Sequence, residues 1–197
     1  MPDSGSSKLS FAIICSSNMN RSMEAHSFLS KKGFRVTSYG TGNQVKLPGT
    51  AAERPNIYDF SIPYADIYKD LVAKDKQHYT QNGILHMLDR NRRIKLKPER
   101  FQDAEISFDV VICCEERCYD QVIEDLESRS KKEGSVVHVI NIDIQDNHDE
   151  ATIGAFFICE LCSMLDDCED LDDEIDQILT KFEARCERNI LHTVCFC

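Results

Sequence analysis

The sequence predicts an α/β protein with three layers, a parallel sheet covered by helices on both faces. Four short apolar runs have the composition of buried strands, and segments with helical periodicity separate or follow them. This alternation favours parallel pairing, because a connecting helix packs back onto the sheet between successive strands. About 65 residues in the middle of the chain interrupt the alternation and predict an insertion after the second strand.

The first strand, helix and second strand come before the insertion. Residues 9–15, LSFAIIC, are apolar and rich in β-branched side chains, which favours a buried strand. Residues 21–32 repeat apolar side chains at helical spacing, and Gly33 is typical of the residue that ends a helix. Residues 34–40 alternate in the manner of a second strand.

The insertion spans about residues 44–105 and contains every proline except Pro2. Its patterns predict two helices, near residues 62–73 and 76–90. No repeat or low-complexity linker separates it from the rest, so we expect it to extend the sheet edge and to shape a substrate groove. A chain of 197 residues with 42% hydrophobic composition is long enough for one sizeable core. We therefore expect residues 1–197 to form a single domain.

The alternation resumes after the insertion. Residues 108–114 and 135–143 are predicted strands, and helical patterns follow them at about 116–129 and 148–166. A last helix is expected at about 170–188, before an extended tail, ILHTVCFC.

Composition excludes several classes of function. The net charge is −11 and no basic stripe is present, which argues against direct binding of nucleic acid. No apolar run is long enough to span a membrane, and the N-terminus MPDSGSSKLS lacks the pattern of a secretion signal. We therefore expect an intracellular protein without membrane association. Its ten cysteines are then expected to be reduced, and most of them to be core side chains.

The stretch CSSNMNRS, residues 15–22, is the candidate site, and we call it the phosphate loop. It joins the first strand to the first helix, and ligands of open α/β sheets bind beyond the carboxyl ends of strands. Successive backbone N–H groups and a helix N-terminus make such a loop an anion site. A cysteine at its start is expected to have a lowered pKa. The residues between the cysteine and the arginine are Ser16, Ser17, Asn18, Met19 and Asn20.

These residue types at this spacing predict a nucleophile inside a phosphate cradle. Arg21 offers a planar fork for two phosphate oxygens, and Ser22 can donate a hydrogen bond to the Cys15 thiolate. Asn18 can fix the loop through side-chain hydrogen bonds to the backbone. Attack of Cys15 on a phosphate monoester would give a phosphocysteine, which water then hydrolyses. The glycine-rich loop of ATP-binding proteins is absent, and the mechanism needs no metal ion or cofactor.

The mechanism also needs an acid that protonates the leaving oxygen. The segment NIDIQDNHDEA after the fourth strand offers two candidates. Asp146 lies in the loop itself and is the favoured acid. Asp143 still belongs to the alternating strand pattern and is the alternative.

Two resemblances follow from these motifs. C-x-x-N-x-x-R-S, together with Gly40-Thr41-Gly42 after the second strand, resembles the low-molecular-weight protein tyrosine phosphatases. A closer resemblance runs through nearly the whole chain, in CSSNMNRSMEAH, YGTG, VKLPG, YTQNGILHMLDRN, PERF, NIDIQDNH and LHTVCF. These motifs resemble the eukaryotic phosphatases of the RNA polymerase II carboxy-terminal domain (CTD), which belong to the machinery of messenger-RNA 3′-end processing.

The closer resemblance implies the activity, the partners and the compartment. The enzyme would be a protein-serine/threonine phosphatase for phosphoserine at the fifth heptad position, and secondarily at the seventh, with the following proline in the cis form. It implies a symplekin-like scaffold as partner and a nuclear location, with a cytoplasmic pool left open. Two departures from the tyrosine phosphatases concern the site. Asn20 stands where their loop has a second cysteine, and Asn147 replaces the proline of their Asp-Pro acid loop.

The segment KLPG, after the Gly42 turn, is expected to reach the rim of the phosphate cradle. Its lysine would meet a charged group, and its leucine and proline would pack on a proline ring. A methionine of the insertion is a further apolar candidate for the same groove. The predicted groove residues are Gly42, Lys46, Leu47, Pro48 and Met87.

Three other interpretations stay open. Arsenate reductases of the same fold relay a disulfide through further cysteines, and this chain has Cys159, Cys162 and Cys168. A metal-binding module is the second, since four potential ligands lie near the C-terminus, although at no standard zinc spacing. These ligands are Cys186, His192, Cys195 and Cys197. The third is a scaffold protein with an inactive site.

Overall fold

A computed structural model of the protein describes residues 7–129 and 134–196. The first six residues, with Pro2 and most of the N-terminal segment, lie outside the described part, as does Cys197. Among the described residues, no helix combines the length and the apolar character needed to cross a membrane.

A five-stranded sheet forms the centre of the molecule, in the order β2-β1-β5-β6-β7. Four neighbouring strands are parallel, as predicted, and β7 pairs with β6 in the antiparallel direction. Two helices lie between β6 and β7, so the chain crosses the sheet twice and β7 begins beside the end of β6, where Ile142 pairs with Ile190. The strands are β1 (Ser10–Cys15), β2 (Arg35–Gly40), β5 (Val110–Cys113), β6 (Val136–Ile142) and β7 (Ile190–Phe196).

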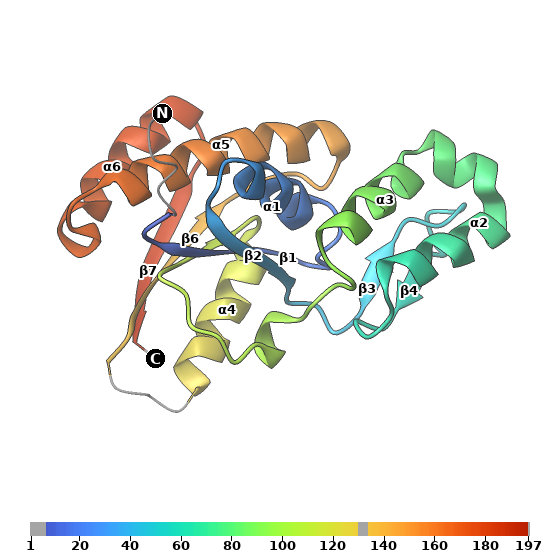
Figure 1. The fold of residues 1–197 in the computed structure, drawn as a ribbon, viewed down its shortest axis with the longest axis horizontal. Coiled ribbons are helices and arrows are strands. Elements are labelled where there is room, and N and C mark those ends of the chain that lie inside the picture. The colour runs from blue at the N-terminus through green and yellow to red at the C-terminus, as the bar shows by residue number, and fades with distance from the viewer. Residues whose placement is uncertain (1–6, 130–133, 197) are drawn as a thin grey trace.

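Helices cover both faces of the sheet, which confirms the predicted α/β layering (Figure 1). Alternate residues of β1 separate two apolar cores, with Phe11 and Ile13 on one side and Ala12 and Ile14 on the other. The first core lies under α1 (Arg21–Lys31), α5 (His148–Asp167) and α6 (Leu171–Cys186), and the second under α4 (Glu116–Ser128).

The insertion contains an antiparallel hairpin, two helices and one 3₁₀ turn. These elements are β3 (Val45–Leu47), β4 (Asn56–Tyr58), α2 (Tyr64–Gln81), α3 (Ile84–Ile94) and η1 (Phe101–Asp103). The predicted helix bounds were wrong. A non-helical Asp75 interrupts α2 where we expected its end, and the chain turns instead at Gly83, whose φ of 80° suits glycine. The hairpin was not predicted because strands of three residues show too little alternation.

Most of the insertion packs against the start of α1, whereas Phe101 of η1 belongs to the second core on the sheet. Its apolar side chains, Leu47, Tyr64 and Leu88 among them, form a third core around Met19 and Met23. In Figure 1, α3 and the hairpin accordingly lie beside the end of the sheet from which α1 starts. The phosphate loop is therefore held between the main sheet and the insertion.

Candidate active site

The phosphate loop begins where β1 ends, at the carboxyl edge of the sheet. Cys15 is the last residue of β1 and is 3% exposed, so its thiol lies at the base of the loop. Its Sγ lies 3.0 Å from the hydroxyl oxygen of Ser22, in the first turn of α1. A hydroxyl at this distance can accept a hydrogen bond from the thiol and can donate one to the thiolate.

Asn18 fixes the shape of the phosphate loop from inside. Its φ of 54° lies in the left-handed region, which asparagine tolerates better than most residues. Its buried amide donates to the hydroxyls of Ser22 at 2.9 Å and Ser38 at 3.1 Å. Its side-chain oxygen accepts a hydrogen bond from the backbone N–H of Glu99 at 3.0 Å. The conformation of the loop is thus set by side chains that do not face a substrate.

The turn after β2 lies directly behind the phosphate loop. The Gly42 N–H donates to the Ser16 carbonyl at 3.0 Å, and the Thr41 N–H donates to the Cys15 carbonyl at 3.1 Å. A Cβ atom on Gly40 would lie 2.6 Å from the Ser16 carbonyl oxygen, so only glycine permits this approach. Gly42 therefore supports the loop from behind and does not line the substrate cavity, where we had placed it.

Three residues of the insertion hold the loop from its other side. The Tyr64 hydroxyl donates to the Asn18 carbonyl at 2.7 Å, and the buried Asn91 amide donates to the Met19 carbonyl at 2.8 Å. Arg90 also donates to the Met19 carbonyl, at 3.1 Å. This role was not predicted from the sequence. The sequence did offer one sign of it. Asn91 is a polar residue at a position that continues the apolar face of α3, and in the structure it is fully buried.

Arg21 lies beneath the loop, and only part of its guanidinium is hydrogen-bonded. Its Nη1 donates to the Ile144 carbonyl at 2.9 Å and pairs with a Glu115 carboxylate oxygen at 2.8 Å. Its Nε is buried without a hydrogen-bond partner, and the side chain is only 5% exposed. Burial lowers the Arg21 pKa, but the charges of Cys15, Cys114, Asp146 and Glu115 outweigh it and raise the pKa above the ordinary value. The guanidinium is therefore a permanent cation.

The segment of residues 143–147, which we call the acid loop, lies beside the phosphate loop. The Asp146 Oδ1 accepts a hydrogen bond from the Asn20 amide at 2.9 Å and lies 3.6 Å from the Arg21 Nε. Its carboxyl group is 63% exposed and borders the cavity that contains Cys15. Asp143, the alternative acid, accepts a hydrogen bond from the Asn141 amide and lines a neighbouring hollow together with Arg21 and Asp146, but it does not line the cavity that contains Cys15. The geometry therefore favours Asp146.

A cavity of about 280 Å³ opens above Cys15 and Arg21. Lys46, Leu47 and Pro48 line one part of it, and the β3 backbone is tied to the loop by a 3.1 Å bond from the Lys46 N–H to the Ser17 hydroxyl. The rest of the lining includes Ile84, Met87, Asp146 and His148. The structure thus brings four of the five predicted groove residues to one cavity with the cysteine and the arginine.

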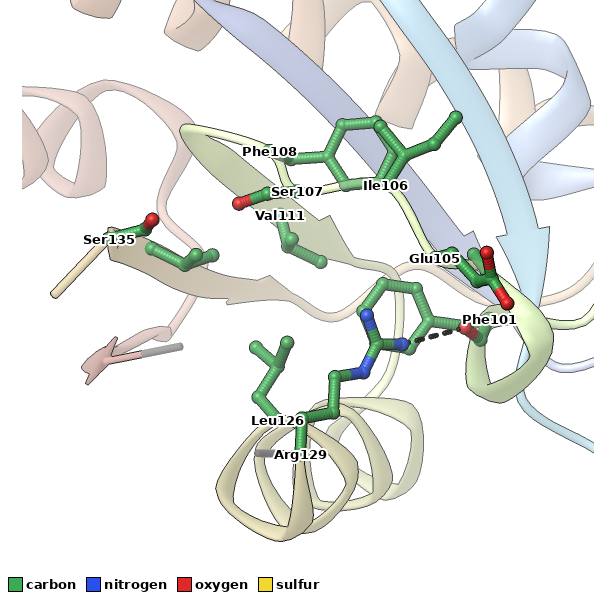
Figure 2. Close-up of a pocket in the computed structure, with 11 residues that line it drawn as sticks. Phe101, Glu105, Ile106, Ser107, Phe108, Val111, Leu126, Arg129 and Ser135 are labelled. Atoms are coloured by element: carbon green, nitrogen blue, oxygen red, sulfur yellow. Dashed lines mark hydrogen bonds between the residues drawn. The ribbon is translucent and has the colours of Figure 1, made fainter. Parts of the chain in front are cut away.

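A second cavity, of about 420 Å³, lies near the start of β5 and β6, away from the phosphate loop (Figure 2). Its lining is mostly apolar, with Phe101, Phe108 and Leu126 among the side chains. The Arg129 guanidinium at its side already donates to the Phe101 carbonyl and pairs with Asp125. None of the described residues that line this cavity is a cysteine or belongs to the phosphate loop, so it does not compete as the phosphate site.

The thiols of the alternative interpretations behave as core side chains. Cys159 and Cys162 are buried on α5, and burial raises the pKa of both. Together with Cys168 they are free thiols in the structure. Of the proposed metal ligands near the C-terminus, His192 lies 3.0 Å from His138, and Cys197 lies outside the described residues. In residues 7–129 and 134–196, no group of three or more metal-binding side chains comes together.

Comparison with known proteins places the chain among phosphatases. A family model described as "Ssu72-like protein" matches residues 9–197. A relative from Bos taurus, named SSU72, a phosphatase of the RNA polymerase II C-terminal domain, is 61% identical over 191 residues, or 97% of this chain and 98% of the relative. The relative of that name from Homo sapiens is 60% identical over the same shares.

Solved structures agree with the sequence relatives. A Drosophila melanogaster Ssu72, bound to symplekin and to a cis peptidomimetic of a CTD peptide phosphorylated at the fifth-position serine, superimposes with a TM-score of 0.94. It is 53% identical and covers 97% of this chain and 100% of its own. Another Ssu72 structure reaches a TM-score of 0.95 at 54% identity, with the same coverage.

Proposed function

This chain belongs to the Ssu72-like protein family, and we propose that it is a cysteine-dependent phosphatase for phosphoserine in the CTD heptads of RNA polymerase II. One observation supports this proposal most directly. The buried Nε of Arg21 lacks a hydrogen-bond partner and belongs to the cavity that contains the Cys15 thiol. A dianionic phosphate would satisfy this donor and the N–H groups of the phosphate loop together.

The reaction would proceed in two displacements. The Cys15 thiolate attacks the phosphorus atom, and the bond from phosphorus to the serine oxygen breaks as Asp146 gives its proton to that oxygen. Water then attacks the phosphocysteine, Asp146 takes a proton from this water, and the Cys15 thiolate leaves as phosphate is formed. Arg21 stays positively charged throughout and stabilises the negative charge on the equatorial phosphate oxygens.

The cavity walls support a proline next to the phosphoserine. Leu47, Pro48 and Met87 offer an apolar surface beside Cys15, while Lys46 supplies a cation at the rim. The Drosophila relative was solved with a cis mimetic, and we extend that preference to this chain. We propose that residues 1–197 act as one phosphatase domain in which the insertion, about 44–105, supplies this wall.

The partner and the cellular compartment are inferred from the relative and from the substrate. The Drosophila relative was solved together with symplekin, and a symplekin-like scaffold is the proposed partner of this chain. Because the proposed substrate is part of RNA polymerase II, the proposed location is the nucleus. A cytoplasmic pool remains a separate prediction, which cell fractionation tests.

Phosphate release from heptad peptides phosphorylated at one serine each tests the substrate. We expect the fastest release from the fifth position, slower release from the seventh, and little from the second. A Cys15→Ser variant serves as the blank. Equal rates at the three positions, or release only from phosphotyrosine peptides, would overturn the proposal.

A time course at high enzyme concentration tests the cis-proline preference. X-Pro bonds in a flexible peptide are mostly trans and exchange over tens of seconds. An enzyme that accepts only the cis form should give a rapid burst and then a slow phase, which a prolyl isomerase accelerates. One phase that does not respond to the isomerase would remove the preference.

A further inference from the structure

We propose that Arg188 is a positioning residue that holds the acid loop so that Asp146 faces the leaving oxygen; this rests on the proposed function. Arg188 lies in the turn between α6 and β7, 42 residues beyond Asp146 in the chain. Its Nη1 donates to the Asp143 carbonyl at 2.9 Å, and its Nη2 pairs with a Glu150 carboxylate oxygen, also at 2.9 Å.

The two partners of Arg188 lie on opposite sides of Asp146 in the sequence. Asp143 is where the chain leaves β6, and Glu150 is in the first turn of α5. A single planar guanidinium therefore fixes the entry and the exit of the acid loop relative to each other. A lysine offers only a compact point charge and does not reproduce this fork.

Packing gives Arg188 a defined orientation. Its guanidinium lies over the Phe157 ring, 5.2 Å from the ring centroid, and its side chain is 21% exposed. Glu150 is 28% exposed, and the backbone N–H of Glu150 donates to the Asn147 side chain that caps α5. The ion pair is therefore fixed by the α5 helix and by the Phe157 ring, and neither side chain extends freely into solvent.

The remaining bonds of the acid loop leave Asp146 itself weakly held. The Ile144 N–H donates to the Cys114 carbonyl at 2.9 Å, and the Ile144 carbonyl accepts from Arg21. Asp146 is largely exposed, and its only polar contacts among the described residues are a hydrogen bond from the Asn20 amide and the Arg21 Nε at 3.6 Å. Its position therefore depends on how the two ends of the loop are fixed, and Arg188 fixes both.

This role has a kinetic signature that a purely structural role lacks. Proton donation matters for serine, whose alkoxide is a poor leaving group, and matters little for an aryl phosphate whose leaving group needs no proton. A displaced acid should therefore slow the serine substrate alone. Misplacement of a catalytic group by about 1 Å can cost up to about a hundredfold in rate.

The experiment compares kcat of Arg188→Ala and Arg188→Lys with wild type on a phosphoserine heptad peptide and on an aryl phosphate. We expect a loss of about tenfold or more on the peptide and less than about twofold on the aryl substrate. Arg185→Ala is the matched control, because Arg185 also lies near the end of α6 and pairs with α5, through Glu160, far along that helix from the acid loop. It should leave both rates unchanged.

A double variant tests whether Arg188 acts through Asp146. In the Asp146→Asn background, Arg188→Ala should cause no further loss on the peptide, because the acid is already absent. An additive loss, or equal losses on both substrates, would overturn the proposal. A wild-type enzyme that hydrolyses the aryl phosphate but not the heptad peptide would instead contradict the proposed function.

A variant of the partner keeps the proposal testable if Arg188 variants do not fold. Glu150→Gln removes the ion pair from the α5 side and keeps a side chain of the same shape. The proposal requires a smaller loss in the same direction, on the peptide and not on the aryl substrate. No difference between the two substrates for this variant would overturn it.

Discussion

The two loops that meet at Cys15 are built in opposite ways. The phosphate loop is buried and is held by bonds from β2, α1 and the insertion, so that Asn18 and Ser22 are fully buried. The acid loop is mostly exposed, and Asp146 keeps 63% of its side chain in solvent. A group that stabilises charge works best when it is fixed in advance. A group that releases and regains a proton in each turnover benefits from contact with water.

This difference predicts which substitutions affect chemistry and which affect folding. Changes in the phosphate loop should affect both, because the same side chains hold the loop and fill the junction of sheet and insertion. Changes at the exposed Asp146 of the acid loop should affect chemistry and leave stability nearly unchanged.

The largest effect is expected for the nucleophile. Cys15→Ser replaces the thiol with a hydroxyl, which is not ionised in the cradle and cannot form the phosphocysteine. We expect kcat to fall by about 10⁴-fold or more, on serine and aryl substrates alike, while peptide binding is kept. Cys168→Ser, at a partly exposed thiol between α5 and α6, should leave the rate unchanged. Substantial residual turnover in Cys15→Ser would mean that another group attacks the phosphorus.

The acid comes next. Asp146→Asn keeps the hydrogen bond with Asn20 within reach but removes the transferable proton. The loss on a phosphoserine peptide should be on the order of a hundredfold, and it should be much smaller on an aryl phosphate. The matched control is Asp143→Asn, whose side chain contacts Asn141 outside the Cys15 cavity. A larger loss from Asp143→Asn than from Asp146→Asn would transfer the acid role to Asp143.

The same contrast explains which parts were predictable from the sequence. The strands, and the junction of β1 with α1, depend on local periodicity and on the spacing of Cys15 and Arg21, which the sequence states directly. The contacts of Tyr64 and Asn91 with the phosphate loop depend on how a distant helix docks, which periodicity does not encode. Glu115 was missed for the same reason, since its pairing with Arg21 joins separate strand ends.

Asn18 tests the folding half of the contrast. Asn18→Ala places a residue that disfavours the left-handed region at a φ of 54° and leaves the Glu99 N–H without its acceptor. We expect the free energy of unfolding to fall by about 2–4 kcal/mol in urea denaturation. Asn43→Ala, at an exposed asparagine of the neighbouring turn, and Asp146→Asn should each change it by less than about 0.5 kcal/mol. A comparable loss of unfolding free energy in Asp146→Asn would contradict the proposed difference between the two loops.

The smallest expected effect is a dependence of stability on pH that arises from His26, which lies beside the residues that hold the phosphate loop. His26, on α1, lies with its Nδ1 2.8 Å from the Ser38 hydroxyl, which also accepts from Asn18. Burial, and then the charge of Lys95, lower the His26 pKa from 6.5 to about 4, although Glu99 opposes this. In the unfolded chain His26 takes up its proton as pH falls below about 6.5, whereas in the folded chain it does so only near pH 4. Protons therefore favour the unfolded state in this window, and stability falls as pH falls through it.

We expect His26 to account for a loss of about 1 kcal/mol in unfolding free energy between about pH 7.5 and pH 5.5. His26→Gln should flatten this slope whatever its own stability, because glutamine does not titrate. His86→Gln, at an exposed histidine of α3, should keep the wild-type slope. Urea denaturation at both pH values measures the slopes. If the slope of unfolding free energy against pH were unchanged in His26→Gln, the pH sensitivity would arise from another titrating group.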